Sequence, residues 1–343
     1  MIRKAISALA AGNDITRDIA AGAMRMIMDG EASPAQTAAF ITALAIQGES
    51  VDVITGCAEV MRSKATHIRA EEPLVDTCGT GGDYANTFNI STAAALVTAG
   101  AGVRVAKHGN RAASSRSGSA DVLAELGVNV ESDVATVERC IAEARIGFMF
   151  APRFHLAMKH AMGVRREIGI RTIFNLLGPL TNPACARHQV LGVSRPDLVP
   201  VLAAVLRNLG SEHVYVVCGT DGLDEISTAA DTRVAELRDG VIREYRVGPE
   251  EFGMRRARIE ELTVGSAAES AAVIRSVLKG ERGPARDIVV VNAGAAIAAA
   301  GAAPDIAAGA KAAERSIDSG GASDALEKLS RISREAGKPE KEA

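Results

Sequence analysis

The stretch Val75-Asp-Thr-Cys-Gly-Thr-Gly-Gly-Asp83 decides which fold to expect from this chain. The apolar residues Pro73-Leu74-Val75 predict a strand that ends where the glycines begin, and glycines let backbone N–H groups come close to an anion. Asn89-Ile-Ser-Thr92 stands just before the apolar stretch Ala93–Ala99, which predicts a helix N-cap at that point. Unpaired N–H groups at a helix N-terminus attract phosphate. The stretch therefore predicts a strand–loop–helix unit that binds a phosphorylated ligand.

Beyond this unit, short β-type runs alternate with helical sequence as far as the C-terminal region. Such alternation is typical of a parallel or mixed sheet covered by helices. Asp239-Gly240 predicts a hairpin turn between Val234–Leu237 and Ile242–Tyr245. Further strands are expected at Val103–Ala106, Phe148–Phe150, Gln189–Val193, Val214–Val217 and Ile288–Val291. Helices are expected at Ser119–Leu126, closed by Gly127, and at Ser132–Ala144, with Ser132 as its N-cap.

The first 70 residues differ, because their apolar residues recur only at helical spacing, with Gly30 and Gly48 as separators. An Arg/His/Lys-rich helical block at residues 153–185 interrupts the later alternation, and we expect it to return to the N-terminal region. We therefore predict a small helical domain made of residues 1–70 with about 160–186. A larger α/β domain would contain residues 74–159 with 187–335, and residues 336–343 would form a flexible tail.

The composition favours a soluble enzyme. Of 343 residues, 47% are hydrophobic and only 3% aromatic, so the core must be built from Ala, Val, Leu and Ile. The net charge of −3 gives no attraction to nucleic acid or to an acidic membrane. The five cysteines include no Cys-x-x-Cys pair, which argues against a zinc site and for a reducing cytoplasm. Neither a signal peptide nor an apolar run long enough to span a membrane is found, so we expect a cytoplasmic protein.

The basic segment Lys107-His-Gly-Asn-Arg111 follows the strand expected at Val103–Ala106, at the edge where open α/β sheets bind ligands. It could be a solvated basic turn. However, the serines at 114, 115, 117 and 119 provide more hydroxyl groups than a loop needs. A lysine surrounded by such donors can neutralise a diphosphate as its negative charge grows.

The acidic segment Asp221-Gly-Leu-Asp-Glu-Ile-Ser227 follows the strand expected at Val214–Val217. Adjacent carboxylates raise each other's pKa, and a divalent cation removes that cost. Mg²⁺ suits the segment because it is usually shared between a few carboxylates and substrate phosphates. An acidic surface loop is the alternative.

Other signals are weaker. Gly79-Thr-Gly-Gly-Asp83 matches neither G-x-G-x-x-G nor the P-loop, and a glycine-rich turn can also serve packing. Asp83 could cap a turn, or it could orient a ribose hydroxyl or a magnesium-bound water. His155 and His160 are spaced wrongly for two metal ligands on one helix face. One arginine of the basic helical block could bind a carboxylate in a bidentate manner. No arrangement for covalent acyl transfer is present.

Taken in order, these motifs resemble those of the anthranilate phosphoribosyltransferases, in the class II nucleoside-phosphorylase-like fold group. The resemblance runs from about residue 5 to about residue 335. Besides the segments quoted above, it covers Arg165-Arg-Glu and Gly169-Ile-Arg-Thr-Ile-Phe-Asn-Leu-Leu-Gly-Pro-Leu-Thr-Asn-Pro183. It implies a small all-helical domain beside a larger α/β domain with a mostly parallel sheet, and a homodimer formed through the helical domain.

The resemblance also implies a reaction. Anthranilate and 5-phosphoribosyl 1-diphosphate would give N-(5-phosphoribosyl)anthranilate and diphosphate, with Mg²⁺, in tryptophan biosynthesis. Lys107 and Asp83 would be catalytic, mainly through positioning and leaving-group stabilisation. Association with the anthranilate synthase of the pathway is conceivable, whereas nucleic acid and membranes are not expected partners.

The site residues follow from the same resemblance. Ser91, Asp224 and Glu225 would hold magnesium, and Gly79, Asn110 and Arg165 would contact anthranilate. The phosphoribosyl diphosphate would be bound by Gly79, Gly82, Asp83, Thr87, Asn89, Ile90, Ser91, Thr92, Lys107, His108, Gly109, Asn110, Arg111, Ala112, Ala113, Ser114, Ser115 and Ser119.

Two positions depart from the family pattern, which usually has proline where this chain has Leu156 and Gly163. Gly163 lies just before Arg165, so we expect an effect on anthranilate affinity rather than on the reaction. Two alternatives share parts of the pattern: a pyrimidine-nucleoside phosphorylase-like enzyme, and a non-enzymatic relative that binds nucleic acid. The glycine loop paired with Asp224-Glu225 fits a diphosphate–magnesium ligand better than the first, and the net charge argues against the second.

Overall fold

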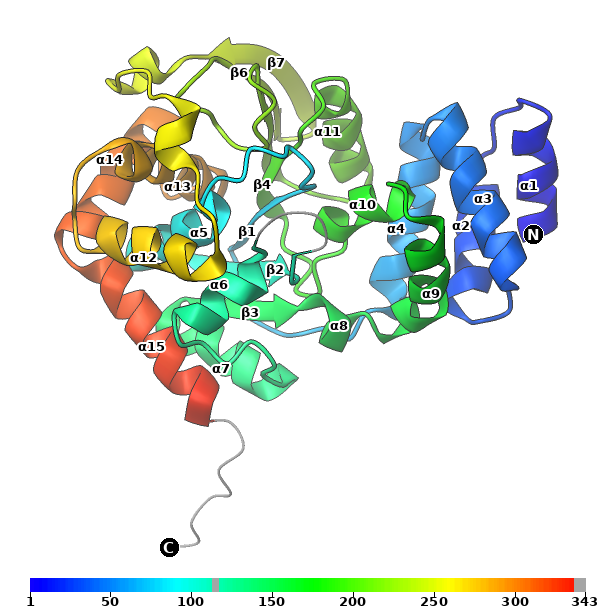
Figure 1. Cartoon of the computed structure of the whole chain (residues 1–343), viewed down its shortest axis with the longest axis horizontal. Coiled ribbons are helices and arrows are strands. Elements are labelled where there is room, and N and C mark those ends of the chain that lie inside the picture. Colours follow the sequence, from blue (N-terminus) through cyan, green and yellow to red (C-terminus); the bar gives the residue numbers. More distant parts are fainter. Residues whose placement is uncertain (113–116, 336–343) are drawn as a thin grey trace, which may run out of the picture.

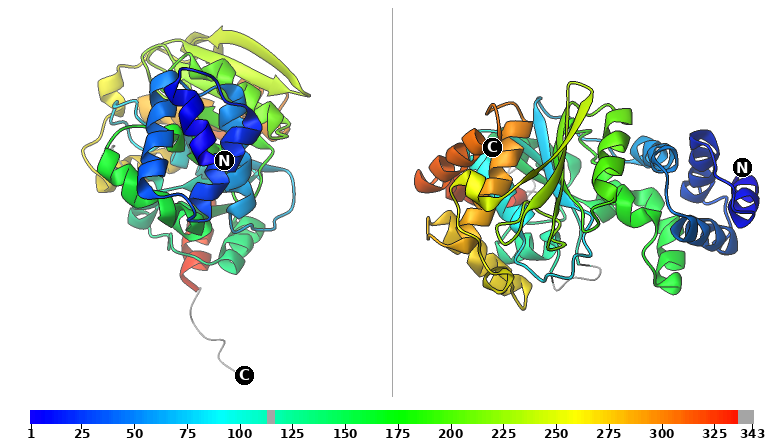
Figure 2. Two further views of the ribbon diagram at one scale, coloured as in Figure 1. Left: turned by 90° about the vertical axis from the view of Figure 1, so that its right-hand side faces the viewer. Right: turned by 90° about the horizontal axis from the view of Figure 1, so that it is seen from above.

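A helical part and an α/β part lie side by side in the computed structural model, which describes residues 1–112 and 117–335 (Figure 1). The sheet is seen edge-on in Figure 2, with α13, α14 and α15 on one side and α11 on the other. The helices α1–α4 lie beyond α11. The described helices include none that is both apolar and long enough to cross a membrane.

The helical part begins with four helices, and the starts of the second, third and fourth are encoded locally. Thr16, Ser33 and Ser50 each accept a hydrogen bond from a backbone N–H in the first turn of the helix that follows. These N-caps replace a missing intrahelical partner for that N–H. The helices are α1 (Ile2–Ala10), α2 (Arg17–Met28), α3 (Pro34–Gln47) and α4 (Val51–Lys64).

Two later helices pack against this bundle. α9 (Lys159–Ile168) contacts α2 and α3, and α10 (Ile173–Leu177) contacts α3 and α4. Buried residues of both helices belong to the same apolar cluster as α1–α4. The cluster continues through α11 (Leu198–Asn208) to one face of the sheet, so the two parts of the molecule share a continuous core.

The sheet has seven strands in the order β3-β2-β1-β4-β5-β6-β7. The first five in this order are parallel, whereas β6 and β7 form an antiparallel hairpin at one edge. This confirms the predicted mostly parallel sheet. The strands are β1 (Leu74–Gly79), β2 (Arg104–Gly109), β3 (Ile146–Phe150), β4 (His188–Gly192), β5 (His213–Gly219), β6 (Thr232–Arg238) and β7 (Val241–Val247).

The other face of the sheet packs on a core made largely of alanine and valine. Small residues allow close helix packing there: a Cβ on Gly294 would lie 2.5 Å from the backbone nitrogen of Ala310. The remaining helices are α5 (Ile90–Gly100), α6 (Ser119–Glu125), α7 (Val134–Ala144), α8 (Ala151–Phe154), α12 (Ala267–Leu278), α13 (Pro284–Ala299), α14 (Ile306–Asp318) and α15 (Gly321–Glu335).

Three local predictions were wrong. The strand expected at Val103–Ala106 runs from Arg104 to Gly109, so Lys107 lies within β2 rather than after it. Ile288–Val291 is not a strand but the buried centre of α13, which begins with Pro284 at its first turn. A short apolar run has the same appearance in a buried strand and in a buried helix, so the flanking proline was the better signal. The N-cap of α7 is Asp133 rather than Ser132, whose hydroxyl donates instead to the carbonyl of Asn129, at 2.8 Å.

Candidate active site

The glycine loop leaves the C-terminal end of β1 and is closed against the acidic loop that follows β5. Gly81 and Gly82 have φ values of +63° and +82°, a conformation that favours glycine. The backbone N–H of Gly81 donates to Oδ2 of Asp224, at 2.9 Å. A Cβ on Gly79 would clash with that same oxygen. The loop therefore needs glycine because an acidic side chain lies directly against its backbone.

Three carboxylates come together here, from Asp83, Asp224 and Glu225. Burial, and then the neighbouring Asp83, raises the pKa of Asp224 to about 7. Burial and the charge of Asp224 raise the pKa of Glu225 well above its ordinary value. The site therefore concentrates negative charge that the described side chains only partly offset.

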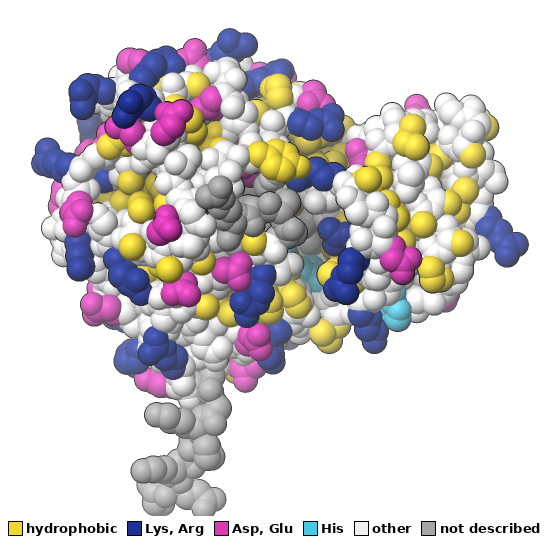
Figure 3. All heavy atoms as spheres, viewed as in Figure 1, with side chains coloured by type: hydrophobic (Ala, Val, Ile, Leu, Met, Phe, Trp, Pro, Cys, Tyr) yellow, Lys and Arg dark blue, Asp and Glu magenta, His cyan; other side chains and the backbone are white. Residues whose placement is uncertain are grey.

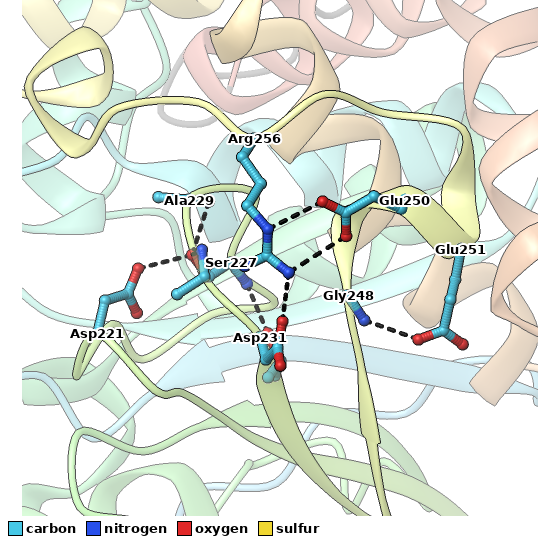
Figure 4. Close-up of polar contacts among 10 residues, drawn as sticks. Asp221, Ser227, Ala229, Asp231, Gly248, Glu250, Glu251 and Arg256 are labelled. Carbon is cyan, nitrogen blue, oxygen red and sulfur yellow. Dashed lines mark hydrogen bonds and ion pairs between the residues drawn. The ribbon is translucent and has the colours of Figure 1, made fainter.

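Polar contacts on both sides brace the acidic loop. The side-chain amide of Asn292, in α13, donates to the carbonyl of Ile226 and accepts from its N–H, both at 2.9 Å. Further along, the Ser227 hydroxyl donates to Asp221, at 2.7 Å. Figure 4 shows how Arg256 then joins Asp231 and Glu250 across the same region. The acidic pair therefore lies on a loop whose backbone is fixed by side chains.

Lys107 lies on β2 and is almost completely buried, with an exposed fraction of 1%. Its ammonium group donates to the carbonyl of Thr77 at 2.6 Å and to the hydroxyl of Ser91 at 3.4 Å. Burial lowers the pKa of Lys107, and the nearby carboxylates of Asp76 and Glu225 act against that effect. Lys107 thus lies between the end of β1 and the first turn of α5.

The N-cap of α5 lies within the predicted segment Asn89–Thr92, but the helix begins at Ile90, earlier than expected. Asn89 is the N-cap and accepts from the N–H of Thr92 at 3.2 Å, while Ile90, Ser91 and Thr92 form the first turn. Thr87 pairs with Thr263 in an isolated antiparallel bridge just before the helix.

The loop after β2 is held by Asp121, near the start of α6. Its Oδ2 accepts from the N–H groups of Ala112 and Gly118, at 2.9 and 3.0 Å, and Arg111 pairs with its Oδ1 at 3.1 Å. The hydroxyl of Ser119 donates to the carbonyl of Asn110, at 3.4 Å. Of the predicted ligand-binding residues, Ala113, Ser114 and Ser115 lie outside the described residues.

A pocket of about 600 Å³ adjoins these loops, and Figure 3 shows a hollow at the junction of the two parts with Lys and Arg side chains at its rim. Gly79 and Thr80 line the pocket from the end of β1 and the loop after it, and His108, Gly109 and Asn110 line it from the end of β2 and the residue after it. The helical side contributes Met158, Met162, Arg165, Phe174 and Asn175, among others. The pocket therefore has sheet loops on one side and a half-buried arginine on the other.

Arg165 lies over the ring of Phe174, with its guanidinium carbon 5.1 Å from the ring centroid. His108 and His155 lie against each other in the same pocket, with ring centroids 5.0 Å apart and the rings tilted by 54°. Burial lowers the pKa of His108 to about 3 and that of His155 to about 4, so both imidazoles are neutral at pH 7. The pocket thus offers aromatic surface, two neutral imidazoles and the cationic side chains of Lys159 and Arg165.

Comparison with known proteins identifies the family. The chain matches the model of the "Glycosyl transferase family, a/b domain" over residues 71–323 and the "helical bundle domain" model of that family over residues 3–65. It is 56% identical to the anthranilate phosphoribosyltransferase of Anaeromyxobacter sp. (strain K), covering 96% of this chain and 98% of that protein. The enzyme of Chloroflexus aggregans is 54% identical, covering 97% of this chain and 98% of that protein.

The chain belongs to the anthranilate phosphoribosyltransferase family.

Solved structures of this family agree with the fold. The enzyme of Thermus thermophilus has a TM-score of 0.91 and 44% identity, covering 96% of this chain and 99% of that one. The enzyme of Saccharomyces cerevisiae, solved in complex with PRPP and Mg, has a TM-score of 0.89 and 26% identity, covering 97% and 98%. Membership of a transferase family confirms the predicted enzyme class and does not support the phosphorylase-like and nucleic-acid-binding alternatives.

Sequence reasoning missed several contributors to the site. Arg171 was quoted only as part of a family motif, yet its guanidinium donates to the carbonyls of Thr80 and Gly81, at 3.2 and 3.0 Å. Asn292 gave no signal, because an isolated amide in an alanine-rich helix has many possible roles. His155 was considered only as a metal ligand.

The two departures from the family pattern lie in or near the pocket. Leu156 lines it and is 62% exposed, and Gly163 lies in α9, where an added Cβ would meet no atom within 4 Å. Their effect on anthranilate affinity stays a prediction.

Proposed function

We propose that this chain transfers the 5-phosphoribosyl group of 5-phosphoribosyl 1-diphosphate to the amine of anthranilate, in tryptophan biosynthesis, as the names of its relatives indicate. One observation carries the proposal. The glycine loop after β1, Lys107 on β2 and the Asp224-Glu225 pair after β5 meet at a single edge of the sheet, beside the pocket that contains Arg165.

Mg²⁺ fits the chemistry of the acidic loop. No group of three or more His, Cys, Asp or Glu side chains within residues 1–112 and 117–335 has the arrangement of a preformed metal site. However, the pKa values of Asp224 and Glu225 are raised, which shows that their negative charges are unfavourable in this site. A bound divalent cation would stabilise both carboxylates in their charged form. We propose that Asp224, Glu225 and Ser91 hold magnesium together with the diphosphate, since Mg²⁺ commonly completes its shell with substrate phosphates. The bound ion would neutralise charge on the diphosphate.

The diphosphate leaves C1 of the ribose as the amine nitrogen of anthranilate bonds to that carbon. Negative charge grows on the departing oxygens, and Lys107 with the backbone N–H groups of the glycine loop would stabilise it. Asp83, whose side chain accepts the N–H of Ala85 at 3.3 Å, would orient the ribose or a water bound to the metal. The rest of the phosphoribosyl diphosphate would be bound by Asn89–Thr92, Lys107–Ser115 and Ser119.

Anthranilate would lie in the pocket against Gly79, Asn110 and Arg165. The guanidinium of Arg165 would bind its carboxylate, and the ring would rest among the aromatic and apolar side chains. The amine is neutral at pH 7, so no strong base is needed for its attack, and the proton can pass to solvent afterwards. This agrees with the neutral state of His108 and His155.

We also keep three assembly predictions as proposals: a homodimer formed through the helical domain, a cytoplasmic location, and association with anthranilate synthase. The contacts of α9 and α10 with α2, α3 and α4 support assigning residues of about 160–186 to the helical domain.

The decisive experiment follows anthranilate fluorescence with purified protein, phosphoribosyl diphosphate and Mg²⁺. Loss of fluorescence that requires all three components supports the proposal. Asp224→Asn combined with Glu225→Gln should lower turnover by about a hundredfold or more at saturating Mg²⁺, because metal and diphosphate lose their carboxylates. Glu244→Gln, at an exposed site on β7, is the matched control. Unchanged turnover in the double variant would refute the assigned metal site, and fluorescence that persists with the parent chain would refute the acceptor.

A further inference from the structure

The central sheet opens between β1 and β2 as these strands approach the site. The two strands pair only at Leu74↔Arg104 and Val75↔Val105. Beyond these pairs, β1 stays paired with β4 as far as Gly79, and β2 stays paired with β3 as far as Gly109. We call the separated ends, Asp76–Gly79 and Ala106–Gly109, the fork.

Side chains replace the missing strand pairing inside the fork. The N–H of His108 donates to Oδ1 of Asp76 at 3.3 Å, and the carbonyl of Ala106 accepts from Nδ2 of Asn182 at 2.8 Å. In an uninterrupted parallel ladder such groups would pair from strand to strand. The two strands therefore separate without leaving these backbone groups unpaired, because the side chains of Asp76 and Asn182 provide the hydrogen bonds.

Asp76 and Asn182 are bonded to each other, with 2.7 Å between Asn182 Nδ2 and Asp76 Oδ2. Their exposed fractions are 1% and 4%. The amide oxygen of Asn182 also accepts the N–H of Ala184, at 2.8 Å. Buried polar groups that lose their partners are costly, so this network restricts both side chains to one arrangement.

The fork has two arms, Asp76–Gly79 at the end of β1 and Ala106–Gly109 at the end of β2, and they lead to different parts of the site. The β1 arm ends at Gly79 and continues into the glycine loop, whereas the β2 arm carries His108 and Gly109 into the pocket wall. The spacing of the arms therefore sets how the phosphate-binding loop faces the acceptor pocket.

Asn182 also connects the fork to the segments that join the two parts of the molecule. It belongs to the segment that runs from the helical part back to β4, and the carbonyl of the next residue, Pro183, accepts the N–H of Ile68 at 3.3 Å. Ile68 lies in the other connection between the two parts, between α4 and β1. The network in the fork therefore touches both connections.

We propose that Asp76 and Asn182 are positioning residues that hold the fork open and fix the alignment of the phosphoribosyl donor with the acceptor pocket. The proposal rests on the function proposed above. Neither residue needs to touch a substrate, because both act through the backbone of the two arms. Their loss should lower turnover more than donor binding, since the glycine loop and Lys107 keep their own contacts.

The test compares Asn182→Ala and Asp76→Asn with the parent chain and with Ser316→Ala. Ser316 is a matched control, because its buried hydroxyl donates to a backbone carbonyl, that of Val97 at 2.7 Å, within the helix layer. Each protein is assayed well below its own Tm. We expect kcat of both fork variants to fall by about tenfold or more, because small misalignments are costly in catalysis. KM for phosphoribosyl diphosphate should change by less than about threefold, and Ser316→Ala should keep the parent kcat despite a lower Tm.

A reciprocal exchange provides a rescue. Asn182→Asp places two buried carboxylates in contact and should lose most activity, whereas adding Asp76→Asn restores one donor–acceptor pair and should recover part of kcat. A kcat within about twofold of the parent in both Asp76→Asn and Asn182→Ala would overturn the proposal, and Asp76→Asn alone decides if Asn182→Ala does not fold. Absence of transfer by the parent chain would instead refute the proposed function, so the two failures are distinguishable.

Discussion

His108 and His155 illustrate how the pocket affects single residues. Both are buried, with exposed fractions of 7% and 6%, and neither has a hydrogen-bond partner at Nε2 within the described part of the chain. Their folded-state pKa values, about 3 and about 4, lie below the value near 6.5 of an unfolded histidine. Their contribution to stability is therefore complete above pH 6.5 and is lost as the pH falls toward the folded-state values.

We expect the free energy of unfolding to fall by about 2 kcal/mol per histidine as the pH is lowered from 7 to 5. In this range each histidine of the unfolded chain binds a proton, whereas the buried imidazole of the folded chain stays neutral. Urea denaturation at the two pH values measures this. In His155→Asn, part of the pH dependence should disappear. The same dependence in that variant and in the parent chain would show that other groups cause it.

At the residue scale, the sequence predicted which segments lie together at the candidate site, because the residue types themselves are unusual. A run of glycines followed by an acid, a lysine beside an asparagine and an arginine, and an adjacent acidic pair each occur at the end of a strand. Strand ends in a parallel sheet meet at one edge, so the grouping of Gly79, Lys107 and Asp224 could be expected from order along the chain. Their individual roles as ligands stay predictions.

At the element scale, local signals predicted the hairpin and the N-cap of α5, but they misplaced the N-cap of α7 and failed where burial was complete. Asp239 and Gly240 turn β6 into β7 with φ values of +52° and +78°, as the dipeptide predicted. α13, in contrast, is buried on all sides and has no amphipathic pattern to reveal it. The same burial lets this helix place Asn292 against the acidic loop.

Replacing Asn292 with leucine tests whether α13 supports the acidic loop. The change keeps a side chain branched at Cγ but removes both contacts with the backbone of Ile226 and leaves those groups unpaired. We expect about 2 kcal/mol lower stability and about tenfold lower turnover. The Mg²⁺ concentration that gives half-maximal rate should rise, because Asp224 and Glu225 immediately precede Ile226. An unchanged Mg²⁺ dependence would limit Asn292 to a structural role.

At the scale of the whole molecule, two arginines join the helical part to the α/β part. Arg62, in α4, donates to the carbonyls of Leu180 and Leu209, at 2.7 and 3.1 Å. Arg171, just before α10, reaches the glycine loop so closely that a Cβ on Gly82 would clash with its guanidinium. The loop that is proposed to bind the diphosphate is therefore held partly by the segment that packs on the helical bundle.

Arg171→Gln should loosen the glycine loop without unfolding the protein, since the arginine is exposed. Loss of about 1 kcal/mol of hydrogen bonding corresponds to an increase of about fivefold in KM for phosphoribosyl diphosphate. Steady-state kinetics with each substrate varied in turn, together with Tm, measure the effect. Arg258→Gln, at an exposed arginine in a turn of the α/β part, provides the control. An equal increase in KM for anthranilate would indicate a general distortion of the cleft instead.

Local pattern alone predicted the alternation of strands and helices, the N-cap of α5 within Asn89–Thr92, and the three loops that supply most polar groups of the site. These depend on neighbours within a few residues, so local pattern is sufficient. Only the tertiary structure decided that Asn182 would fill the fork beside Asp76, 106 residues away, and that Arg171 would hold the glycine loop, some 90 residues away. Such contacts arise because packing of the two parts brings distant segments together, and no local propensity encodes which buried amide or exposed arginine will meet which backbone group.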